Sequence, residues 1–314
     1  MKAAVLEAVK CTPQYRDFAD PTPAEGEVLV EVTASAIKPV DRQLAAGTHF
    51  ASPREFPVVC GSDGVGRLGD GSRVFFGGPR PPYGAMATRT VVRRAQCFPM
   101  PAELDDATAA AIANPGVSAW LSLQHRARVA SGETVLILGA TGVTGKLAIQ
   151  IAKLLGAGRV VAAGRNPEAL SKLPELGADA TIPLEADAFR RESQVKSFDV
   201  VLDYLWGAPT EALLSALTRE GFAIAGSETR LLQVGESAGA TISLPAAVLR
   251  SAPVTILGTA GIPPFDVLTA ALEKVFDHAA HGQLRIDIDR MPLAEVATAW
   301  ERPDRGRRCV LTMG

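Results

Sequence analysis

The pattern of apolar and polar residues divides the 314-residue chain into a β-rich first third and a longer part in which strands and helices alternate. Before residue 100, short alternating segments are separated by turns rich in glycine and proline, such as residues 77–82. Many short strands with such turns are typical of a barrel-like domain. The expected strands of this part are 3–9, 28–32, 64–68, 73–76 and 88–92.

From residue 133 on, apolar strands alternate with helical stretches, which indicates a parallel sheet. Six strands are expected, as in a complete doubly wound dinucleotide-binding domain. The expected strands are 134–138, 159–163, 180–184, 198–203, 231–235 and 254–258. The expected helices include 105–113, 117–128, 167–177, 209–217 and 264–280, with a break at Asn114-Pro115-Gly116. We expect the tail, residues 284–313, to return to the first domain.

The stretch from residue 134 to residue 156 is the strongest candidate for ligand binding. A continuous apolar strand is followed by Gly139, Gly142 and Gly145, and then by apolar residues at helical spacing. Small residues let a ligand approach the backbone, and the helix start offers free N–H groups to a phosphate. This strand–turn–helix context predicts a pyrophosphate site surrounded by Thr141, Gly142, Val143 and Thr144.

The end of the second strand of this sheet indicates which dinucleotide binds. An NAD-specific domain places an acid there, where it accepts hydrogen bonds from the ribose 2′-hydroxyl. Here the residues are Gly164, Arg165 and Asn166, with no acid. Because glycine leaves room and arginine can pair with a 2′-phosphate, the sequence predicts NADPH. The alternative is that Arg165 is a solvated residue at the start of a loop.

Further cofactor contacts are expected from position alone. Tyr204, Gly235 and Glu236 follow strand ends, where ligands bind in such sheets. Asn114 and Ser118 lie at the expected domain junction and are candidates for the nicotinamide ribose. Their alternative role is helix punctuation and capping.

Composition and charge exclude several function classes. The net charge of −2 gives no electrostatic basis for binding nucleic acid or anionic membranes. The four cysteines show no close pair, so neither a disulfide framework nor a cysteine-built zinc site is supported. No apolar segment approaches the ~20 residues of a membrane helix, and the N-terminus does not resemble a signal peptide. We therefore expect a soluble, cytoplasmic protein.

The order of these features resembles the medium-chain dehydrogenase/reductase superfamily, and within it the zinc-free quinone oxidoreductase branch that includes zeta-crystallin. Ala36-Ile-Lys-Pro-Val-Asp-Arg42 is similar to that branch's Ile-Asn-Pro-Val-Asp motif, and Gly139-Ala-Thr-Gly-Val-Thr-Gly145 to its Gly-Ala-Ser-Gly-Gly-Val-Gly motif. The resemblance implies a GroES-like substrate domain, 1–116 with 264–314, and an NADPH-binding Rossmann domain, 117–263, with the active site between them. It also implies a homodimer formed through the edge strand 254–258.

The same resemblance argues against zinc. Zinc-dependent alcohol dehydrogenases of the superfamily bind catalytic zinc with an early cysteine and the histidine of Gly-His-Glu. The first site falls in Lys38-Pro-Val-Asp41, which has no cysteine, and the second reads Gly61-Ser62-Asp63. Serine does not replace imidazole as a zinc ligand at ordinary affinity. We expect no metal, and we interpret Cys60 as a core residue.

The substrate cleft in this resemblance is lined by residues that depart from the relatives: Lys38 replaces asparagine and Gln43 replaces tyrosine. A Lys38 ammonium could stabilise an enolate or hydroquinone anion and donate a proton, which makes it the candidate catalytic residue. The alternative is a Lys38–Asp41 surface pair of little value. Tyr83 is a possible donor or a structural residue. The full expected cleft set is Lys38, Asp41, Gln43, His49, Ser62 and Tyr83.

These features predict an NADPH-dependent, zinc-independent oxidoreductase that transfers hydride to a quinone, an enone or a related activated carbonyl. Two alternatives remain open at this point. One is an enoyl or alkenal double-bond reductase, and the other is a non-catalytic, crystallin-like NADPH-binding protein.

Overall fold

The computed structural model describes residues 1–218, 228–259, 261, 263–303 and 305–314. They form two compact units: unit 1 is Met1–Asn114 with Glu273–Gly314, and unit 2 is Pro115–Leu272. The units therefore change at residues 114/115 and 272/273, rather than at 116/117 and 263/264. The assignment of a function to each domain stays a prediction.

Unit 1 is organised around one long strand, β3 (Glu27–Ala36), which pairs with three others. Its alternate residues Val30, Val32 and Ala34 are buried, whereas Glu31 is exposed, as expected of a strand with one face on a core. A seven-stranded sheet has the order β15-β16-β3-β5-β6-β8, with β7 also on β3, and a three-stranded sheet has the order β2-β1-β4. The other strands are β1 (Lys2–Leu6), β2 (Gln14–Asp17), β4 (Val58–Val59), β5 (Asp63–Arg67), β6 (Arg73–Gly77), β7 (Arg89–Arg93), β8 (Cys97–Pro99), β15 (Ile288–Pro292) and β16 (Arg308–Thr312).

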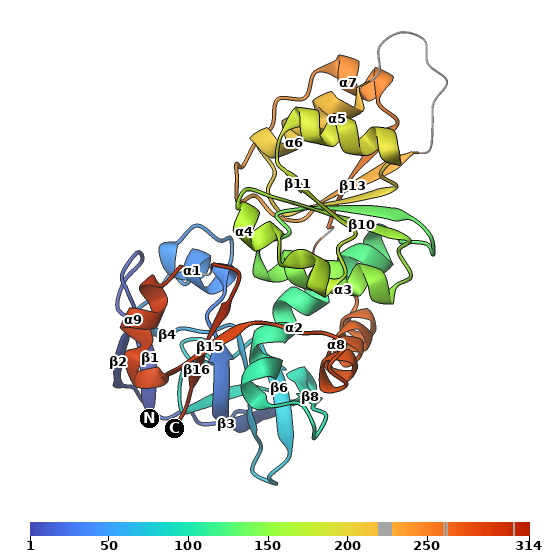
Figure 1. The fold of residues 1–314 in the computed structure, drawn as a ribbon. Helices are drawn as coiled ribbons and strands as arrows, with labels where there is room; N and C mark the ends of the chain where they lie inside the picture. The colour runs from blue at the N-terminus through green and yellow to red at the C-terminus, as the bar shows by residue number, and fades with distance from the viewer. Residues whose placement is uncertain (219–227, 260, 262, 304) are drawn as a thin grey trace. The chain divides into compact units, whose positions relative to one another are not determined.

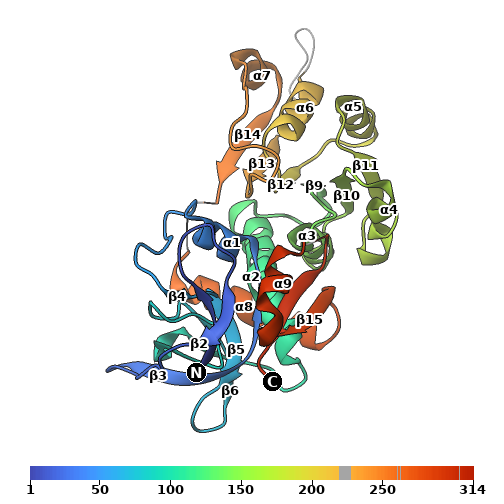
Figure 2. The same cartoon turned by 90° about the vertical axis from the view of Figure 1, so that its left-hand side faces the viewer.

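The end of the chain returns to unit 1, as predicted. Strand β16 pairs antiparallel with β3, with Val310 opposite Ala36. Both chain termini accordingly lie at the same end of this unit (Figure 1 and Figure 2). The described helical segments that lie wholly within unit 1 are α1 (Pro39–Ala46), the 3-10 turns η1 (Arg94–Gln96) and η4 (Leu293–Glu295), and α9 (Val296–Glu301).

Unit 2 contains the predicted six-stranded parallel sheet, in the order β11-β10-β9-β12-β13-β14. This order is that of a doubly wound dinucleotide-binding sheet. Helices α3 and α4 cover one face, and α5, α6 and α7 cover the other (Figure 1). The elements are β9 (Thr134–Leu138), α3 (Val143–Leu154), β10 (Arg159–Gly164), α4 (Pro167–Leu170), η3 (Leu173–Leu176), β11 (Ala180–Pro183), α5 (Ala186–Val195), β12 (Val200–Asp203), α6 (Ala208–Leu217), β13 (Thr229–Gln233), α7 (Ala246–Ser251) and β14 (Val254–Gly258).

Two expected helix boundaries were wrong. Helix α2 (Asp106–Trp120) continues through Pro115 and runs into a π-helix, η2 (Leu121–Arg126). Proline removes one helical hydrogen bond, but Ile112 and Ala119 on either side are fully buried, so packing retains the helix. The expected helix 167–177 is instead α4 followed by the separate turn η3, in which Pro174 is one of the first residues. The expected helix 264–280 is present as α8 (Phe265–Ala280).

Within the described part of the chain, no helix combines the length and the hydrophobicity that crossing a bilayer requires.

The packing of unit 2 predicts a large cost for truncating Phe189, which is fully buried in the cluster between the sheet and helices α5 and α6. We expect Phe189→Ala to lower the free energy of unfolding, measured by urea denaturation, by about 3–5 kcal/mol. Phe50→Ala is the matched control, because Phe50 is 94% exposed, and its cost should be below about 0.5 kcal/mol. Similar unfolding midpoints for the two variants would contradict the packing described here.

Candidate functional site

The glycine turn of unit 2 is built by the backbone. Gly139 has a φ of +82°, and its N–H donates to the Ala163 carbonyl at 3.1 Å, which ties the turn to the end of β10. Gly142 is the N-cap of α3 and presents no side chain to the helix start. Among the residues that the structure describes, the N–H groups of Val143, Thr144 and Gly145 have no hydrogen-bond acceptor. This arrangement fits a phosphate group.

Three glycines are required by close approach around this turn. A Cβ on Gly145 would lie 2.4 Å from the Gly139 carbonyl oxygen, which is too close for any side chain. A Cβ on Gly164 would lie 2.9 Å from the Thr141 Cγ2, and one on Gly235 would lie 2.7 Å from the Tyr204 carbonyl oxygen. The predicted residues Thr141, Gly164, Tyr204 and Gly235 therefore meet at the carboxyl ends of β9, β10, β12 and β13.

Asp203 organises the loop after β12, and the sequence reasoning did not identify it. Its fully buried carboxylate accepts the N–H groups of Leu205 at 2.8 Å and Trp206 at 2.9 Å, and the Thr210 hydroxyl donates to it as well. Burial raises the pKa of this carboxyl group, and these hydrogen bonds only partly offset the effect. An acid at the end of an otherwise apolar strand was the available signal.

Tyr204, held by this loop, has a hydroxyl group with an unused hydrogen-bonding capacity. The oxygen is buried and has no hydrogen-bond partner in the described part of the chain, and burial raises its pKa. An orphaned buried hydroxyl normally marks a missing partner. The backbone and Cβ of Tyr204 lie next to Gly139 and Gly235, at the same edge of the sheet as the glycine turn, which is consistent with a bound cofactor as that partner.

The other predicted cofactor residues differ in their surroundings. Arg165 is exposed and forms no hydrogen bond or ion pair with another described residue, so its guanidinium is available to a phosphate. The Asn166 carboxamide oxygen accepts the Ala169 N–H at 3.1 Å and thereby caps α4. Glu236 is exposed. The alternative role of Asn114 and Ser118 as helix punctuation is wrong, because α2 runs through both.

In unit 1, Lys38 lies at the start of α1 and is fully buried. Its ammonium nitrogen lies 2.8 Å from the Asp63 Oδ1, 3.1 Å from the Asp41 Oδ2 and 3.2 Å from the Ala36 carbonyl oxygen. The two side chains of the Lys38–Asp41 pair are 0% and 1% exposed, so the interpretation of this pair as a surface contact was wrong. We call Lys38, Asp41 and Asp63 the lysine cluster.

Asp41 also holds the neighbouring loop. Its Oδ1 accepts the backbone N–H of Ser62 at 3.0 Å and the Ser62 hydroxyl at 2.9 Å, while its Oδ2 accepts the Lys38 N–H at 3.0 Å. Burial by itself lowers the pKa of Lys38, but the Asp41 and Asp63 carboxylates outweigh it, so the pKa is raised. Burial raises the pKa of Asp63, and the Lys38 charge opposes that shift. Lys38 is therefore held in its protonated form.

A cavity of about 840 Å³ lies within unit 1, with a mainly apolar lining that includes Leu44, Phe56 and Val59. Of the six predicted cleft residues, Asp41, Ser62 and Tyr83 line it, and Lys38, Gln43 and His49 do not. The Tyr83 ring packs edge-on against Phe18 with centroids 6.0 Å apart. Gln43 is exposed, and the half-buried His49 accepts the Ala51 N–H through its Nδ1 at 3.1 Å.

Zinc does not fit the residues around this cavity. Within the described residues, no group of three or more His, Cys, Asp or Glu side chains is arranged to hold a metal ion. The Ser62 hydroxyl donates to Asp41, and burial raises the pKa of the Cys60 thiol, which disfavours the thiolate that zinc requires. The metal-free character of the chain stays a prediction.

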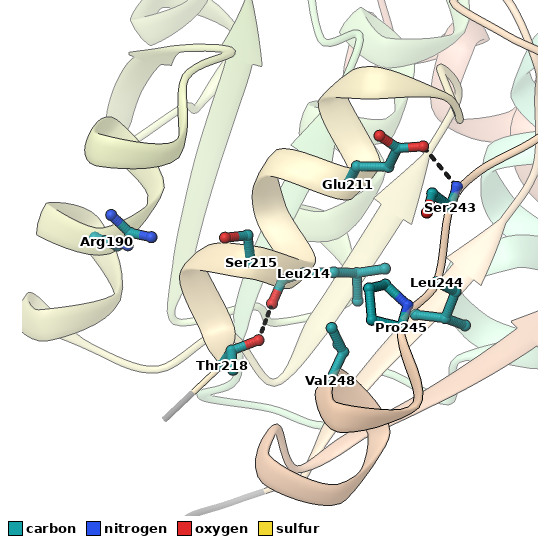
Figure 3. A pocket seen from close by; sticks show the side chains of 9 residues that line it. All are labelled: Arg190, Glu211, Leu214, Ser215, Thr218, Ser243, Leu244, Pro245 and Val248. Carbon is teal, nitrogen blue, oxygen red and sulfur yellow. Dashed lines mark hydrogen bonds between the residues drawn. The ribbon is translucent and has the colours of Figure 1, made fainter. Parts of the chain in front are cut away.

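A second pocket, of about 440 Å³, lies among α5, α6 and the segment that leads into α7 (Figure 3). It is lined by Arg190 on one side and by Leu214, Pro245 and Val248 on the other. The Glu211 carboxylate accepts the Ser243 N–H at 2.6 Å and fixes the loop at its edge. None of the residues predicted from sequence line this pocket.

Comparison with known proteins identifies relatives over the whole chain. A family model described as zinc-binding dehydrogenase matches residues 176–309. A probable NADPH-dependent quinone reductase, tdiC, of Emericella nidulans is 26% identical over 351 residues, which covers 95% of this chain and 96% of that protein. The crystal structure of the quinone oxidoreductase of Thermus thermophilus, also solved with NADPH, is 28% identical, with a TM-score of 0.83 and complete coverage of both chains.

Two further relatives match a part of their own length only. A mycocerosic acid synthase-like polyketide synthase of Mycobacterium tuberculosis is 32% identical over 227 residues, which is 67% of this chain and 10% of that protein. A 2-methylene-furan-3-one reductase of Solanum lycopersicum is 32% identical over 204 residues, 60% of this chain and 52% of that protein. The chain thus spans a tenth of the first relative and about half of the second.

The lysine cluster predicts that Lys38→Met destabilises the protein strongly. Methionine preserves most of the volume but leaves two buried carboxylates without their cation, which should cost about 3–5 kcal/mol in the free energy of unfolding. Adding Asp41→Asn and Asp63→Asn to Lys38→Met should recover part of the loss. The control is Lys172→Met, which removes an exposed pair with Glu168 and should change little.

The pH dependence follows from the raised pKa of Lys38. A raised pKa contributes stability below the unfolded-state value of 10.5 and loses it as the pH rises through the folded-state value. The difference between wild type and Lys38→Met should therefore stay constant between pH 7 and pH 9 and shrink only above about pH 10.5. A difference that is small already at pH 7 would contradict the buried pairing.

Proposed function

Because the chain belongs to the medium-chain dehydrogenase/reductase superfamily, in its quinone oxidoreductase branch, we propose that it is an NADPH-dependent, zinc-independent reductase of quinones, enones or related activated carbonyls. The family makes it an oxidoreductase of the quinone oxidoreductase type. The choice of NADPH, the substrate class and the site residues are the proposal.

The observation that carries the proposal is the combination at the end of β10. The turn at Gly139–Gly145 offers free N–H groups to a pyrophosphate, and the next strand ends in Gly164 followed by the exposed Arg165, without a carboxylate. A carboxylate there would accept from a 2′-hydroxyl and repel a 2′-phosphate, whereas a guanidinium attracts the phosphate. When bound, the cofactor supplies the hydride.

The side chains around the turn have distinct tasks in this proposal. The three N–H groups at the start of α3 bind the pyrophosphate, and Arg165 binds the 2′-phosphate. Asp203 fixes the loop that carries Tyr204, whose unpaired hydroxyl is available to the cofactor. Asn114 and Ser118 are proposed to contact the nicotinamide ribose.

In unit 1, the cavity is proposed to receive the substrate. Its apolar walls suit the ring of a quinone or the carbon skeleton of an enone, and Ser62 and Tyr83 supply polar groups. The Ser62 hydroxyl already donates to Asp41, so it can accept, but not donate, toward a ligand. A catalytic role for Lys38 stays a prediction, and its fully engaged ammonium favours a positioning role.

One specific observation favours reduction of a carbon–carbon double bond as a second candidate. The tomato relative is named as a reductase of a 2-methylene-furan-3-one, a ketone conjugated with an exocyclic double bond. Such a compound and a quinone share the conjugated carbonyl that accepts hydride.

We also propose a homodimer formed through β14, which is an edge strand of its sheet.

A consumption assay tests the proposal. NADPH oxidation at 340 nm should occur with conjugated acceptors, quinones and enones, and remain at least about tenfold lower in kcat/KM with saturated aldehydes of the same size. Product analysis separates hydroquinone formation from double-bond reduction. Tight NADPH binding without turnover across quinones, enones and aldehydes would instead establish a non-catalytic NADPH-binding protein.

Arg165→Asp tests the cofactor choice. Loss of a charge-assisted contact and gain of a like charge should lower kcat/KM for NADPH by about 10- to 100-fold, since such a hydrogen bond is worth about 1.5–3 kcal/mol. The value for NADH should rise or stay constant. Arg191→Asp, the same change at an exposed residue of α5, is the control and should leave both values unaltered. An unchanged NADPH preference in Arg165→Asp would show that Arg165 does not bind the 2′-phosphate.

A further inference from the structure

The lysine cluster joins two segments that are distant in sequence. Ala36, Lys38 and Asp41 come from the end of β3 and the start of α1, and Asp63 begins β5. Three oxygens surround the Lys38 ammonium at 2.8, 3.1 and 3.2 Å, one from each of Asp63, Asp41 and Ala36. An ammonium group carries three N–H donors, so each donor has one oxygen. The group is thus held as a bound cation would be.

The Asp41 carboxylate and the Asp63 backbone are held independently of the lysine side chain. Asp41 is held by three donors, the N–H of Lys38 and both the N–H and the hydroxyl of Ser62. The backbone of Asp63 is held by the Ser35 hydroxyl, which donates to its carbonyl oxygen at 2.9 Å. Removal of the ammonium would therefore leave the Asp41 carboxylate and the backbone of Asp63 close to their present places.

The two segments that form the lysine cluster correspond to the zinc-ligand segments of the zinc-dependent relatives. Residues 38–41 and 61–63 are those in which the zinc-dependent relatives are expected to carry their cysteine and histidine ligands, and here they meet at a lysine. The atoms around the ammonium are all oxygens. Oxygen ligands suit hard cations, whereas zinc prefers nitrogen and sulfur ligands. The family model described as zinc-binding dehydrogenase matches residues 176–309 and does not include these two segments.

We propose that the Lys38 ammonium is a built-in cation that fills an oxygen-lined site formed by Asp41, Asp63 and the Ala36 carbonyl, in place of a metal ion. The wild-type chain excludes metal from this site by occupying it. Truncating the lysine leaves two buried carboxylates and a carbonyl oxygen around an open volume, which is a site for a hard divalent cation. This inference does not depend on the substrate or the cofactor of the enzyme.

Binding of Mn²⁺ to the full-length chain tests the proposal. Free Mn²⁺ measured by electron paramagnetic resonance at pH 7.5 should show one bound equivalent in Lys38→Ala, with an affinity at least about tenfold above that of wild type. Lys38→Met is the matched control, because its side chain fills the volume without a charge and should block binding. The double variant Lys38→Ala with Asp63→Asn should lose the gain.

Two outcomes overturn the proposal. One is a folded Lys38→Ala, verified by circular dichroism, that binds Mn²⁺ no better than wild type does. The other is Mn²⁺ binding by wild type that Asp63→Asn abolishes, since the ammonium would then not exclude the metal.

A measurement on the wild type covers the case in which Lys38→Ala does not fold. Nitrogen-15 NMR of lysine ammonium groups should show a Lys38 signal with hydrogen exchange at least about tenfold slower than that of the exposed Lys172, and the signal should not broaden when Mn²⁺ is added. Exchange as fast as that of Lys172 would show that the three oxygens do not hold the ammonium, and the proposal would fail.

Discussion

Two carboxylates buried in unit 1 have to be matched by positive charge, and the arrangement of α1 and of the loop before β5 depends on that requirement. An isolated buried carboxylate would cost several kcal/mol, so it persists only with a partner and with its other oxygen satisfied. Lys38 forms ion pairs with both Asp41 and Asp63, and the other oxygen of Asp41 fixes Ser62. One lysine thereby sets the position of a helix start and of a loop that lines the cavity of this unit.

The two units place their candidate groups by different physical means. In unit 2 the phosphate turn is made by backbone, and glycines are required where a Cβ would collide with a carbonyl oxygen, as at Gly145. In unit 1 the corresponding work is done by side chains and buried charge. This difference explains why the turn could be identified from the glycine spacing and its flanking strand and helix. The role of Lys38, in contrast, became clear only from the residues that contact it in the structure.

Much of the fold could be predicted because local pattern and global topology agree. The apolar strands of unit 2 and the glycine turn after Leu138 predicted a six-stranded parallel sheet, which the structure confirms. The tail returned to unit 1 as expected, since Val310 lies opposite Ala36. These features depend on periodicity and turn chemistry, which a sequence displays directly.

The errors came where packing outweighed a local signal. Asn114-Pro115-Gly116 reads as a helix break, but the surrounding turns of α2 are buried and the helix continues. The three-residue spacing of Lys38 and Asp41 is typical of an exposed ion pair. The spacing does not show that Asp63, 25 residues further along the chain, also contacts Lys38 and that the pair is buried. Asp203 was missed although its donors are close in sequence, because an acid at a strand end does not by itself show that the following loop folds back onto it.

The pairing of β16 with β3 has a consequence for folding during translation. Unit 1 contains strands from both ends of the chain, and the contact between Arg308 and the Ile37 carbonyl oxygen joins residues 271 positions apart. Unit 2 is continuous in sequence, so all of its residues leave the ribosome before the last strand of unit 1 is made. Until β16 is made, β3 lacks one of its neighbours and exposes an unpaired strand edge. Synthesis therefore favours completion of the Rossmann sheet before the sheet of unit 1 receives β16.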